Sequence, residues 1–193
     1  MTLNNLAENA ASDLIETLNL GRSQFDLLGQ TGHWLAESLI AGQVIFLCGN
    51  GGSAAEAQHL AAEFVGRFSL ERPGLPAIAL TTDTSILTAV GNDYGFEEIF
   101  ARQIQALGRP GDILWGLSTS GQSPNVLKAL ALARERGLKT LFMCGPKIMD
   151  PQMADIIIPI NAATTARIQE MHLFYGHLLC QMVENLIFSG SRS

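Results

Sequence analysis

The sequence lacks the excess of basic residues that would suit it to nucleic acid and the long apolar run that would suit it to a membrane. Charged residues make up only 16% of its 193 positions, and 12 basic side chains face 18 acidic ones, for a net charge of −6. Nucleic-acid binding needs a patch of cations that neutralises phosphates, so composition argues against that function. No apolar run approaches the roughly 18 residues that a transmembrane helix needs.

Cysteine is also scarce, and its spacing excludes two kinds of site. Cys48, Cys144 and Cys180 are odd in number and show no CxxC pattern. Such cysteines are typical of reduced thiols rather than of a disulfide framework or a thiolate metal site. The first residues contain neither a basic segment nor an apolar core of signal-peptide type. We therefore expect a cytoplasmic protein.

Apolar residues, in contrast, are abundant, at 47% of the chain. A chain of this length forms one domain that buries roughly two-thirds of its unfolded surface. With a membrane excluded, the surplus of apolar surface predicts an oligomer interface.

Short apolar runs alternate with amphipathic stretches along the chain. The first forty residues are helical in pattern, because leucine and alanine recur there at intervals of three and four. The later patterns predict strands over 44–48, 77–80, 112–118, 139–144 and 155–160, and helices over 54–68, 84–90, 96–107, 125–136 and 165–187. This order is typical of a doubly wound α/β fold, with a mainly parallel five-stranded sheet flanked by helices.

A five-stranded sheet is too small for all the helices at the two ends of the chain to pack on it. We therefore expect these helices at the oligomer surface. We divide the single structural domain into an N-terminal helical region over residues 1–42, which packs in the oligomer, and an α/β domain over residues 43–193.

A glycine-rich loop, CGNGGSAAEA over 48–57, follows the first predicted strand. Ligands of open α/β sheets bind where strand ends meet helix N-termini, and these glycines would let the backbone approach a ligand. The same letters also fit a tight turn with Ser53 as a helix N-cap. The loop lacks GxGxxG, and no acidic residue ends the next strand, so we do not expect a dinucleotide.

A serine-rich loop, LSTSGQSPN over 117–125, follows the third predicted strand. Ser118, Thr119, Ser120 and Ser123 place four hydroxyls within six residues at a helix start, where free N–H groups favour an anion. A capped turn would need only one or two of them, so phosphate binding is favoured. No lysine follows in a Walker pattern, which excludes a nucleoside-triphosphate loop.

Residues of the types that bind metal ions occur on two of the predicted helices. His59 and Glu63 are four residues apart and share a helix face. The last helix carries Gln169, His172 and His177, and the first and last of these lie ~12 Å apart along the axis and ~80° around it. Zinc accepts histidine nitrogen and carboxylate oxygen. Helical residues of these types are commonly solvated or hydrogen-bonded locally, so the residues alone leave both interpretations open.

A fourth motif, VGNDYGF over 90–96, has two interpretations. Gly91 would end a helix, with Asn92 and Asp93 in the following turn, as a C-cap and turn require. A loop at a strand end could equally bring a carboxylate to substrate hydroxyls.

Together these motifs resemble those of the bacterial phosphoheptose isomerases, within the sugar isomerase (SIS) family. The resemblance runs from about residue 35 to residue 186, through CGNGGS, QHLAAEFVGRF, RPGLPAIALTTD, VGNDYGF, STSGQS and ARIQEMHLFYGH. The serine loop is common to many sugar-phosphate binders. The pairing of His59 and Glu63 with Gln169 and His177 is more specific.

The resemblance implies one SIS domain over 43–193, a homotetramer with active sites between subunits, and one Zn²⁺ per subunit. It implies that the zinc ligands are His59, Glu63, Gln169 and His177. The implied substrate contacts come from Asn50, Gly51, Gly52, Ser53, Glu63, Asn92, Asp93, Ser118, Thr119, Ser120, Ser123 and Gln169.

The implied reaction converts D-sedoheptulose 7-phosphate to D-glycero-D-manno-heptose 7-phosphate, the first step toward the ADP-heptose precursor of the lipopolysaccharide core. Glu63 would take the C1 proton as base, and His177 would deliver or relay protons on the other side. Zinc would polarise the carbonyl. Both residues are thereby expected to act as ligand and as acid or base.

A rival function comes from a related family of the same fold, the tetrameric proteins that bind the replication initiator DnaA without catalysis. Those proteins usually lack the acidic residue at position 63 and the histidine at position 177. Both residues are present here, which favours the enzyme. A different isomerase or a sugar-phosphate sensor would share the serine loop, but the histidine and carboxylate set counts against it.

Overall fold

Among residues 3–148 and 150–189, which the computed structural model describes, five parallel strands form the sheet that the apolar runs predict. They are β1 (Ile45–Cys48), β2 (Ala77–Ala79), β3 (Ile113–Ser118), β4 (Lys139–Cys144) and β5 (Ile156–Pro159), in the order β2-β1-β3-β4-β5. This is the flavodoxin-like order of doubly wound sheets, in which the strand order reverses between β1 and β3. The two strands are parallel neighbours, with Cys48, the last residue of β1, opposite Gly116 near the carboxyl end of β3.

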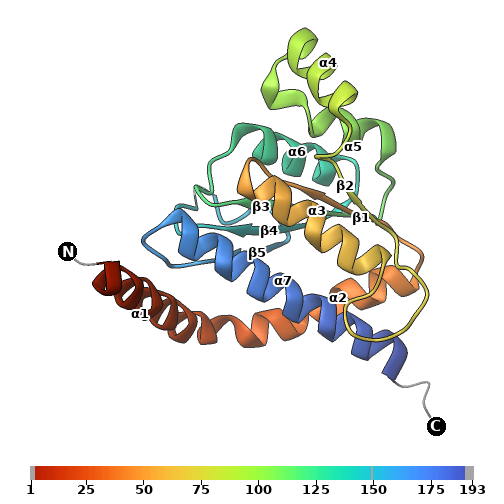
Figure 1. Cartoon of the computed structure of the whole chain (residues 1–193). Coiled ribbons are helices and arrows are strands. Elements are labelled where there is room, and N and C mark those ends of the chain that lie inside the picture. Colours follow the sequence, from red (N-terminus) through yellow and green to blue (C-terminus); the bar gives the residue numbers. More distant parts are fainter. Residues whose placement is uncertain (1–2, 149, 190–193) are drawn as a thin grey trace.

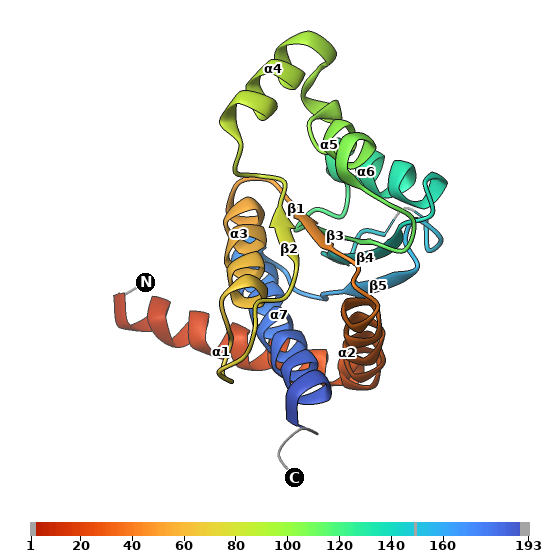
Figure 2. The same cartoon turned by 90° about the vertical axis from the view of Figure 1, so that its right-hand side faces the viewer.

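Helices cover both faces of the sheet. They are α1 (Leu3–Gly21), α2 (Phe25–Ile40), α3 (Gly52–Val65), α4 (Thr84–Tyr94), α5 (Ala101–Leu107), α6 (Pro124–Glu135) and α7 (Thr165–Phe188). Figures 1 and 2 show α2, α3 and α7 on one side of the sheet and α5 and α6 on the other. The fold class predicted from the sequence is confirmed.

Alternating strand residues supply the two halves of the core. Ile45 and Leu47 of β1 join the core under α2, α3 and α7, whereas Phe46 and Cys48 join the core under α5 and α6. Trp115 of β3 is fully buried and packs edge-on against Phe64 of α3, with ring centroids 6.5 Å apart. A large apolar side chain buried in this way contributes roughly 1.5–3 kcal/mol. Parallel strands covered on both sides therefore read as continuous apolar runs.

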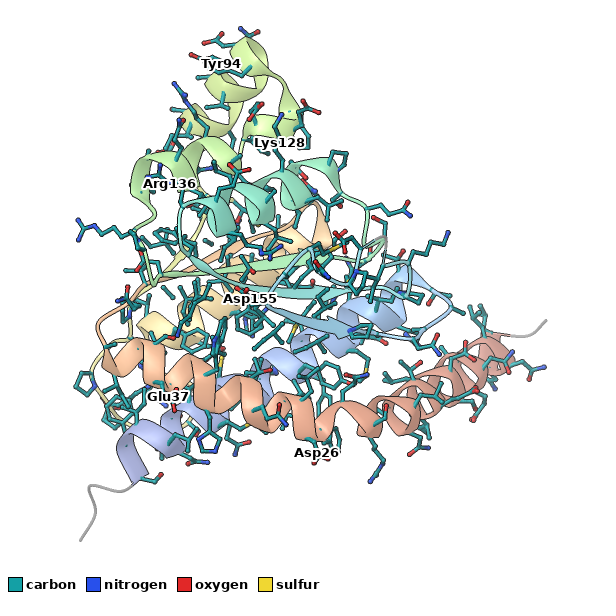
Figure 3. All side chains as sticks on the ribbon, turned by 180° about the vertical axis from the view of Figure 1, so that it is seen from behind. Asp26, Glu37, Tyr94, Lys128, Arg136 and Asp155 are labelled. Carbon is teal, nitrogen blue, oxygen red and sulfur yellow. The ribbon has the colours of Figure 1, made fainter. Side chains whose placement is uncertain are left out.

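Charged side chains lie mostly at the surface. Figure 3 shows Asp26 and Glu37 pointing away from the sheet. Asp155 is also exposed but has a structural role, since its carboxylate accepts hydrogen bonds from the Thr140 backbone N–H at 2.8 Å and hydroxyl at 2.9 Å and so joins the start of β5 to β4. Within the described ranges, no helix has the length and apolar character needed to cross a membrane.

Several predicted helix boundaries were wrong, most clearly around the GND motif. The helix predicted over 84–90 continues through Gly91 to Tyr94, and it stops at Gly95, whose φ is +99°. A glycine inside a helix costs only about 1 kcal/mol, whereas a left-handed φ does end one. The helix predicted over 96–107 is a 3₁₀ turn, Phe96–Glu98, followed by α5.

The helix predicted over 54–68 runs instead from Gly52 to Val65. Its early end is explained by the carboxylate of Glu184, on α7. That carboxylate accepts the backbone N–H groups of Phe68 at 2.7 Å, Ser69 at 2.9 Å and Leu70 at 2.9 Å. Three N–H groups that bind a side chain on another helix cannot continue the hydrogen-bond ladder of α3.

The same carboxylate forms a buried ion pair with Arg72. Arg72 Nε lies 2.9 Å from Glu184 Oε1, and both side chains are 1% exposed. The other guanidinium nitrogens donate to the carbonyl oxygens of Phe64 and Glu63, each at 2.8 Å. The pair therefore fixes the C-terminal end of α3 against α7.

Hydrogen bonding determines the charge state of Glu184. Burial by itself opposes ionisation, but the backbone N–H groups of Ser69, Phe68 and Leu70 outweigh it and lower the pKa of Glu184 from 4.5 to about 2. A carboxylate with a lowered pKa contributes stability that is present above its unfolded pKa of 4.5 and is lost as pH falls toward 2.

We predict that Glu184→Gln lowers the free energy of unfolding at pH 7 by about 3–5 kcal/mol, because Arg72 is left buried without a counter-charge. Denaturant titration at several pH values measures this, and the gap to the wild type should narrow below pH 4.5. Glu71→Gln is the matched control, since the Arg67–Glu71 pair has 57% and 92% exposed side chains. It should cost less than about 1 kcal/mol. Equal losses in the two variants would contradict the assigned role of Glu184.

Candidate functional site

The glycine loop and the serine loop lie side by side because β1 and β3 are neighbours in the sheet. In the glycine loop, Gly51 has a φ of +54° and α3 begins at Gly52 without a side-chain cap. The alternative interpretation, with Ser53 as the N-cap, is excluded, because Ser53 lies inside the helix and is buried. The turn is closed instead by the Ser53 N–H, which donates to the Asn50 carbonyl at 2.9 Å.

The serine loop gathers three of its four hydroxyls. Ser118 Oγ lies 2.8 Å from Ser123 Oγ and 3.3 Å from Ser120 Oγ, and Thr119 is half-buried between them in the chain. Ser123 occupies the N-cap position of α6 but makes no capping bond. The first residue of α6, Pro124, has no N–H, and the Val126 N–H donates to Asn125 Oδ1 at 2.9 Å. What suits an anion here is the cluster of hydroxyls beside the positive end of the helix dipole.

An amide pair joins the two loops. Asn50 Nδ2 donates to Asn125 Oδ1, and Asn125 Nδ2 donates to Asn50 Oδ1, both at 2.8 Å. Asn50 was expected from the sequence to contact substrate, whereas Asn125 had no assigned role. Its position in the first turn of α6, directly after the serines, was the signal available in the sequence.

Helices α3 and α7 bring together three of the four predicted metal ligands within one chain. His59 Nε2 lies 2.7 Å from His177 Nε2 and 3.4 Å from Glu63 Oε1, and ligand atoms of the three residues all lie within 4.8 Å of one another. The fourth, Gln169, is two turns earlier on α7. Its amide lies against Gly52, where an added Cβ would overlap Gln169 Nε2.

A surface hollow of about 560 Å³ collects most of these groups. Its lining residues are Gly52, Ala55, Glu56, His59, Ala166, Gln169, Glu170, Leu173 and His177. The hollow therefore extends from the glycine loop along the α3–α7 seam to the two histidines.

The two imidazoles lie within hydrogen-bond distance of each other. Nitrogens 2.7 Å apart repel if both present lone pairs, so in the metal-free protein one ring donates its Nε2–H to the other. Burial, and to a lesser extent the neighbouring His59, lowers the pKa of His177 below 6.5, while Glu63 acts to raise this pKa. A neutral imidazole near pH 7 is the form that binds zinc, and two imidazoles with a carboxylate are an accepted zinc donor set. The residues present therefore fit a zinc ion.

A second buried pair lies beside this cluster. His172, which the sequence placed among the candidate ligands, is fully buried, and its Nδ1 lies 3.1 Å from Glu56 Oε2. Glu56 was missed by the sequence interpretation, although it lies one turn before His59 on the same helix. This pair joins α3 to α7 on the N-terminal side of the cluster.

Known proteins share both the sequence and this architecture. The sequence model of the family described as the SIS domain matches residues 9–145. A phosphoheptose isomerase of Solidesulfovibrio magneticus is 48% identical over 96% of this chain and 95% of its own. One of Nitratidesulfovibrio vulgaris, strain Miyazaki F, is 56% identical over 81% of this chain and 76% of its own. The solved structure of a phosphoheptose isomerase from Francisella tularensis superposes with a TM-score of 0.92 at 34% identity, covering 96% of this chain and 100% of that one.

The chain belongs to the SIS domain family. The resemblance inferred from the motifs is thereby confirmed, and within the SIS domain family the matched relatives are phosphoheptose isomerases, a class of enzyme.

The GND residues of this SIS domain lie outside the hollow. Asn92 and Asp93 were expected in a turn, but they are exposed residues of α4, and Asn92 Nδ2 donates to Asp93 Oδ1 at 2.8 Å. Figures 1 and 2 show α4 projecting beyond the sheet and the other helices. A single SIS domain therefore does not gather these two residues with the histidine cluster.

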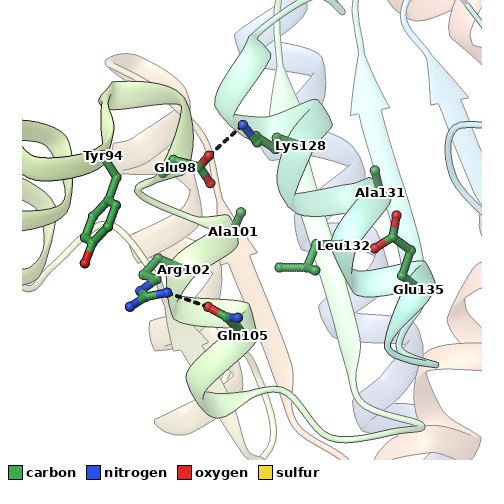
Figure 4. Close-up of a pocket in the computed structure, with 9 residues that line it drawn as sticks. All are labelled: Tyr94, Glu98, Ala101, Arg102, Gln105, Lys128, Ala131, Leu132 and Glu135. Carbon is green, nitrogen blue, oxygen red and sulfur yellow. Dashed lines mark hydrogen bonds and ion pairs between the residues drawn. The ribbon is translucent and has the colours of Figure 1, made fainter.

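A second pocket, of about 380 Å³, lies between α5 and α6 (Figure 4). Its cations are already engaged, because Lys128 Nζ lies 2.6 Å from Glu98 and Arg102 donates to Gln105 at 2.9 Å and stacks on the Tyr94 ring. This pocket contains none of the site residues predicted from the SIS motifs.

We predict that His177 in the metal-free protein titrates with a midpoint below pH 6.5, as histidine NMR signals would measure. Because the unfolded state then binds the proton more readily, the free energy of unfolding should decrease as pH falls below 6.5. His59→Gln removes one cause and should raise the midpoint, while burial keeps it below 6.5. A midpoint at or above 6.5 in the wild type would show that the cluster does not disfavour the imidazolium.

Proposed function

We propose that this protein isomerises the ketose sedoheptulose 7-phosphate to the aldose D-glycero-D-manno-heptose 7-phosphate, the step that supplies lipopolysaccharide core precursors. The observation that carries the proposal is the cluster of His59, Glu63 and His177, within 4.8 Å, in a chain 48% identical over nearly its whole length to a phosphoheptose isomerase. Catalysis by proton transfer requires such groups, whereas a binding scaffold has no need of them.

The serine loop holds the phosphate in this proposal. Ser118, Ser120 and Ser123 point their hydroxyls at one another, and Thr119 lies within the same turn. Each hydroxyl that donates to a phosphate oxygen contributes a net of roughly 0.5–1.5 kcal/mol, and the positive end of the α6 dipole adds to it. The sugar chain then extends over the glycine loop toward the hollow, past Asn50, Gly51, Gly52 and Ser53.

The reacting end of the sugar lies at the histidine cluster. Glu63 takes the proton from C1, which leaves an enediolate with its charge on O2, and later returns that proton to C2. His177, neutral because its pKa is lowered, accepts the hydroxyl proton of O1 and returns it to O2. The exchange moves hydrogen from C1 to C2 and converts ketose to aldose, and Gln169 lies beside the path at Gly52.

We also propose one zinc ion per chain, held by His59, Glu63, Gln169 and His177. Zinc in this place supplies a Lewis acid for the carbonyl oxygen of the substrate. The protein contributes the donor set and its spacing, which the α3–α7 contact maintains.

The alternative, a catalytically inactive scaffold that binds DnaA, is weaker. The relatives at about half identity carry an enzyme's name, and the histidine and carboxylate set is retained.

We further propose that the chain acts in the cytoplasm as a homotetramer. The cysteines among the described residues are free and buried, as suits a reducing compartment. Apolar residues of α1 are exposed, and they are Leu3 at 85%, Leu6 at 55%, Ile15 at 59% and Leu20 at 52%. Each Å² of this surface covered in an assembly contributes ~25 cal/mol. The N-terminal helical region, residues 1–42, is the proposed oligomer contact; residues 1 and 2 of it lie outside the described residues.

We predict that Glu63→Gln abolishes isomerisation, with at least a 10²-fold loss of kcat, because the amide neither accepts the C1 proton nor carries a ligand charge. The assay follows aldose formation from sedoheptulose 7-phosphate, with zinc content measured on the same samples. Glu71→Gln is a control, since that side chain is 92% exposed in the loop after α3. Turnover by Glu63→Gln at the wild-type rate would remove Glu63 from the mechanism.

For the assembly, we predict that light scattering of the wild type at micromolar concentration gives about four times the mass of the chain. The double variant Leu6→Lys, Ile15→Lys should give a smaller mass, because charge cannot be buried against an apolar face. Glu8→Lys, an exposed polar position of the same helix, should leave the mass unchanged. A monomeric wild type with full activity would refute the tetramer.

A further inference from the structure

Asn125 is a buried polar residue to which the proposed mechanism assigns no role. It is 2% exposed, and its side chain uses both ends of its amide toward Asn50, at 2.8 Å each. Its Oδ1 also accepts the Val126 backbone N–H at 2.9 Å. A side chain with these bonds is fixed in one orientation relative to the first turn of α6.

Only an amide satisfies this geometry on both sides. Asn125 must donate to Asn50 Oδ1 and accept from Asn50 Nδ2, and neither a carboxylate nor a hydroxyl offers an oxygen and an NH₂ in that planar arrangement. The two residues are 75 positions apart and belong to different loops. The two hydrogen bonds therefore fix the distance between the two loops, rather than the conformation of either loop alone.

The glycine loop is held on its opposite side as well. Gly52 lies so close to the Gln169 amide that an added Cβ would overlap it. Residues 50–52 thus connect the serine loop, through Asn125, to the end of the hollow that contains Gln169 and the histidine cluster. A change at the amide pair alters the separation of the two ends of the site.

We propose that Asn125 is a positioning residue that acts through Asn50 to set the distance between the phosphate loop and the histidine cluster, and so selects the chain length of the sugar phosphate. The inference rests on the proposed function, in which the phosphate and the reacting carbons occupy these two ends. A ketose phosphate one carbon shorter cannot bridge the same distance with its carbonyl in place.

The test compares the kcat/KM of the purified protein for sedoheptulose 7-phosphate and for fructose 6-phosphate, with inorganic phosphate as a competitive inhibitor. For Asn125→Ala, we expect the seven-carbon to six-carbon ratio of kcat/KM to fall at least about 5-fold. The inhibition constant of inorganic phosphate should change less than about 3-fold, because Ser118 and Ser123 still bond to each other. A residue needed only for folding would not separate these two quantities.

A matched control is Gln103→Ala. Gln103 is also buried, and its amide donates to two backbone carbonyls, of Leu80 and Ile99, at 2.9 Å each. Its hydrogen bonds reach neither loop, so its loss should lower Tm and leave the seven-to-six ratio unchanged.

Asn125→Asp is a second variant in case the alanine variant does not fold. Its carboxylate still accepts from Asn50 and Val126, and a negative charge is favourable in the first turn of a helix. Both substrates carry the same phosphate, so the added charge cancels in the ratio, which should fall in the same direction.

Two outcomes separate the inference from the function beneath it. A wild type that turns over neither sugar overturns the proposed function. A wild type that isomerises the heptose, with Asn125 variants that keep the wild-type seven-to-six ratio while losing stability as Gln103→Ala does, overturns the positioning role alone.

Discussion

The fixed spacing between α3 and α7 is the constraint on which the site depends. At one end, the ion pair of Glu184 and Arg72 is buried, and Arg72 also holds the last carbonyls of α3. At the other end, Glu56 and His172 meet at 3.1 Å. Buried charged groups tolerate little displacement, because a lost partner leaves an uncompensated charge in a low dielectric. The histidine cluster lies between these two pairs along both helices, so its donor distances follow from theirs.

The sheet supplies the second half of the arrangement. Because β1 and β3 are adjacent and parallel, the N-termini of α3 and α6 lie side by side at one edge. One carries the glycine loop and the other the serine loop, and the amide pair of Asn50 and Asn125 joins them. In the proposed function, the site therefore has an anion-binding end and a proton-transfer end. A phosphorylated sugar has this same division, with a charged terminus and a reactive carbonyl several carbons away.

Patterns within about twenty residues were enough to predict the strands and most helices, and to single out the candidate ligands on each helix. The errors arose where a distant residue decided the outcome. Glu184, on α7, accepts the N–H groups that would continue α3, and no residue near Val65 indicates that the helix ends there. His59 and His177, which are in contact, are 118 positions apart in the sequence. The spacing along α7 placed Gln169 and His177 near the limit of one ion's reach. The structure shows that the partner of His177 is instead His59, on the facing helix α3. Gly91 misled the prediction of α4 because φ, not residue type, ends a helix.

His177 of the histidine cluster and Glu184 of the buried ion pair change their protonation states at different pH values. His177 resists protonation until below pH 6.5, since burial and His59 disfavour its cation. Glu184 keeps its charge down to about pH 2, because three backbone N–H groups stabilise its carboxylate. On acidification, therefore, His177 gains a positive charge while the ion pair of Glu184 and Arg72 still holds α3 against α7. A protonated imidazole cannot ligate a cation, so we expect the candidate site to lose cation binding before the frame loosens, and neutralisation to restore it without refolding.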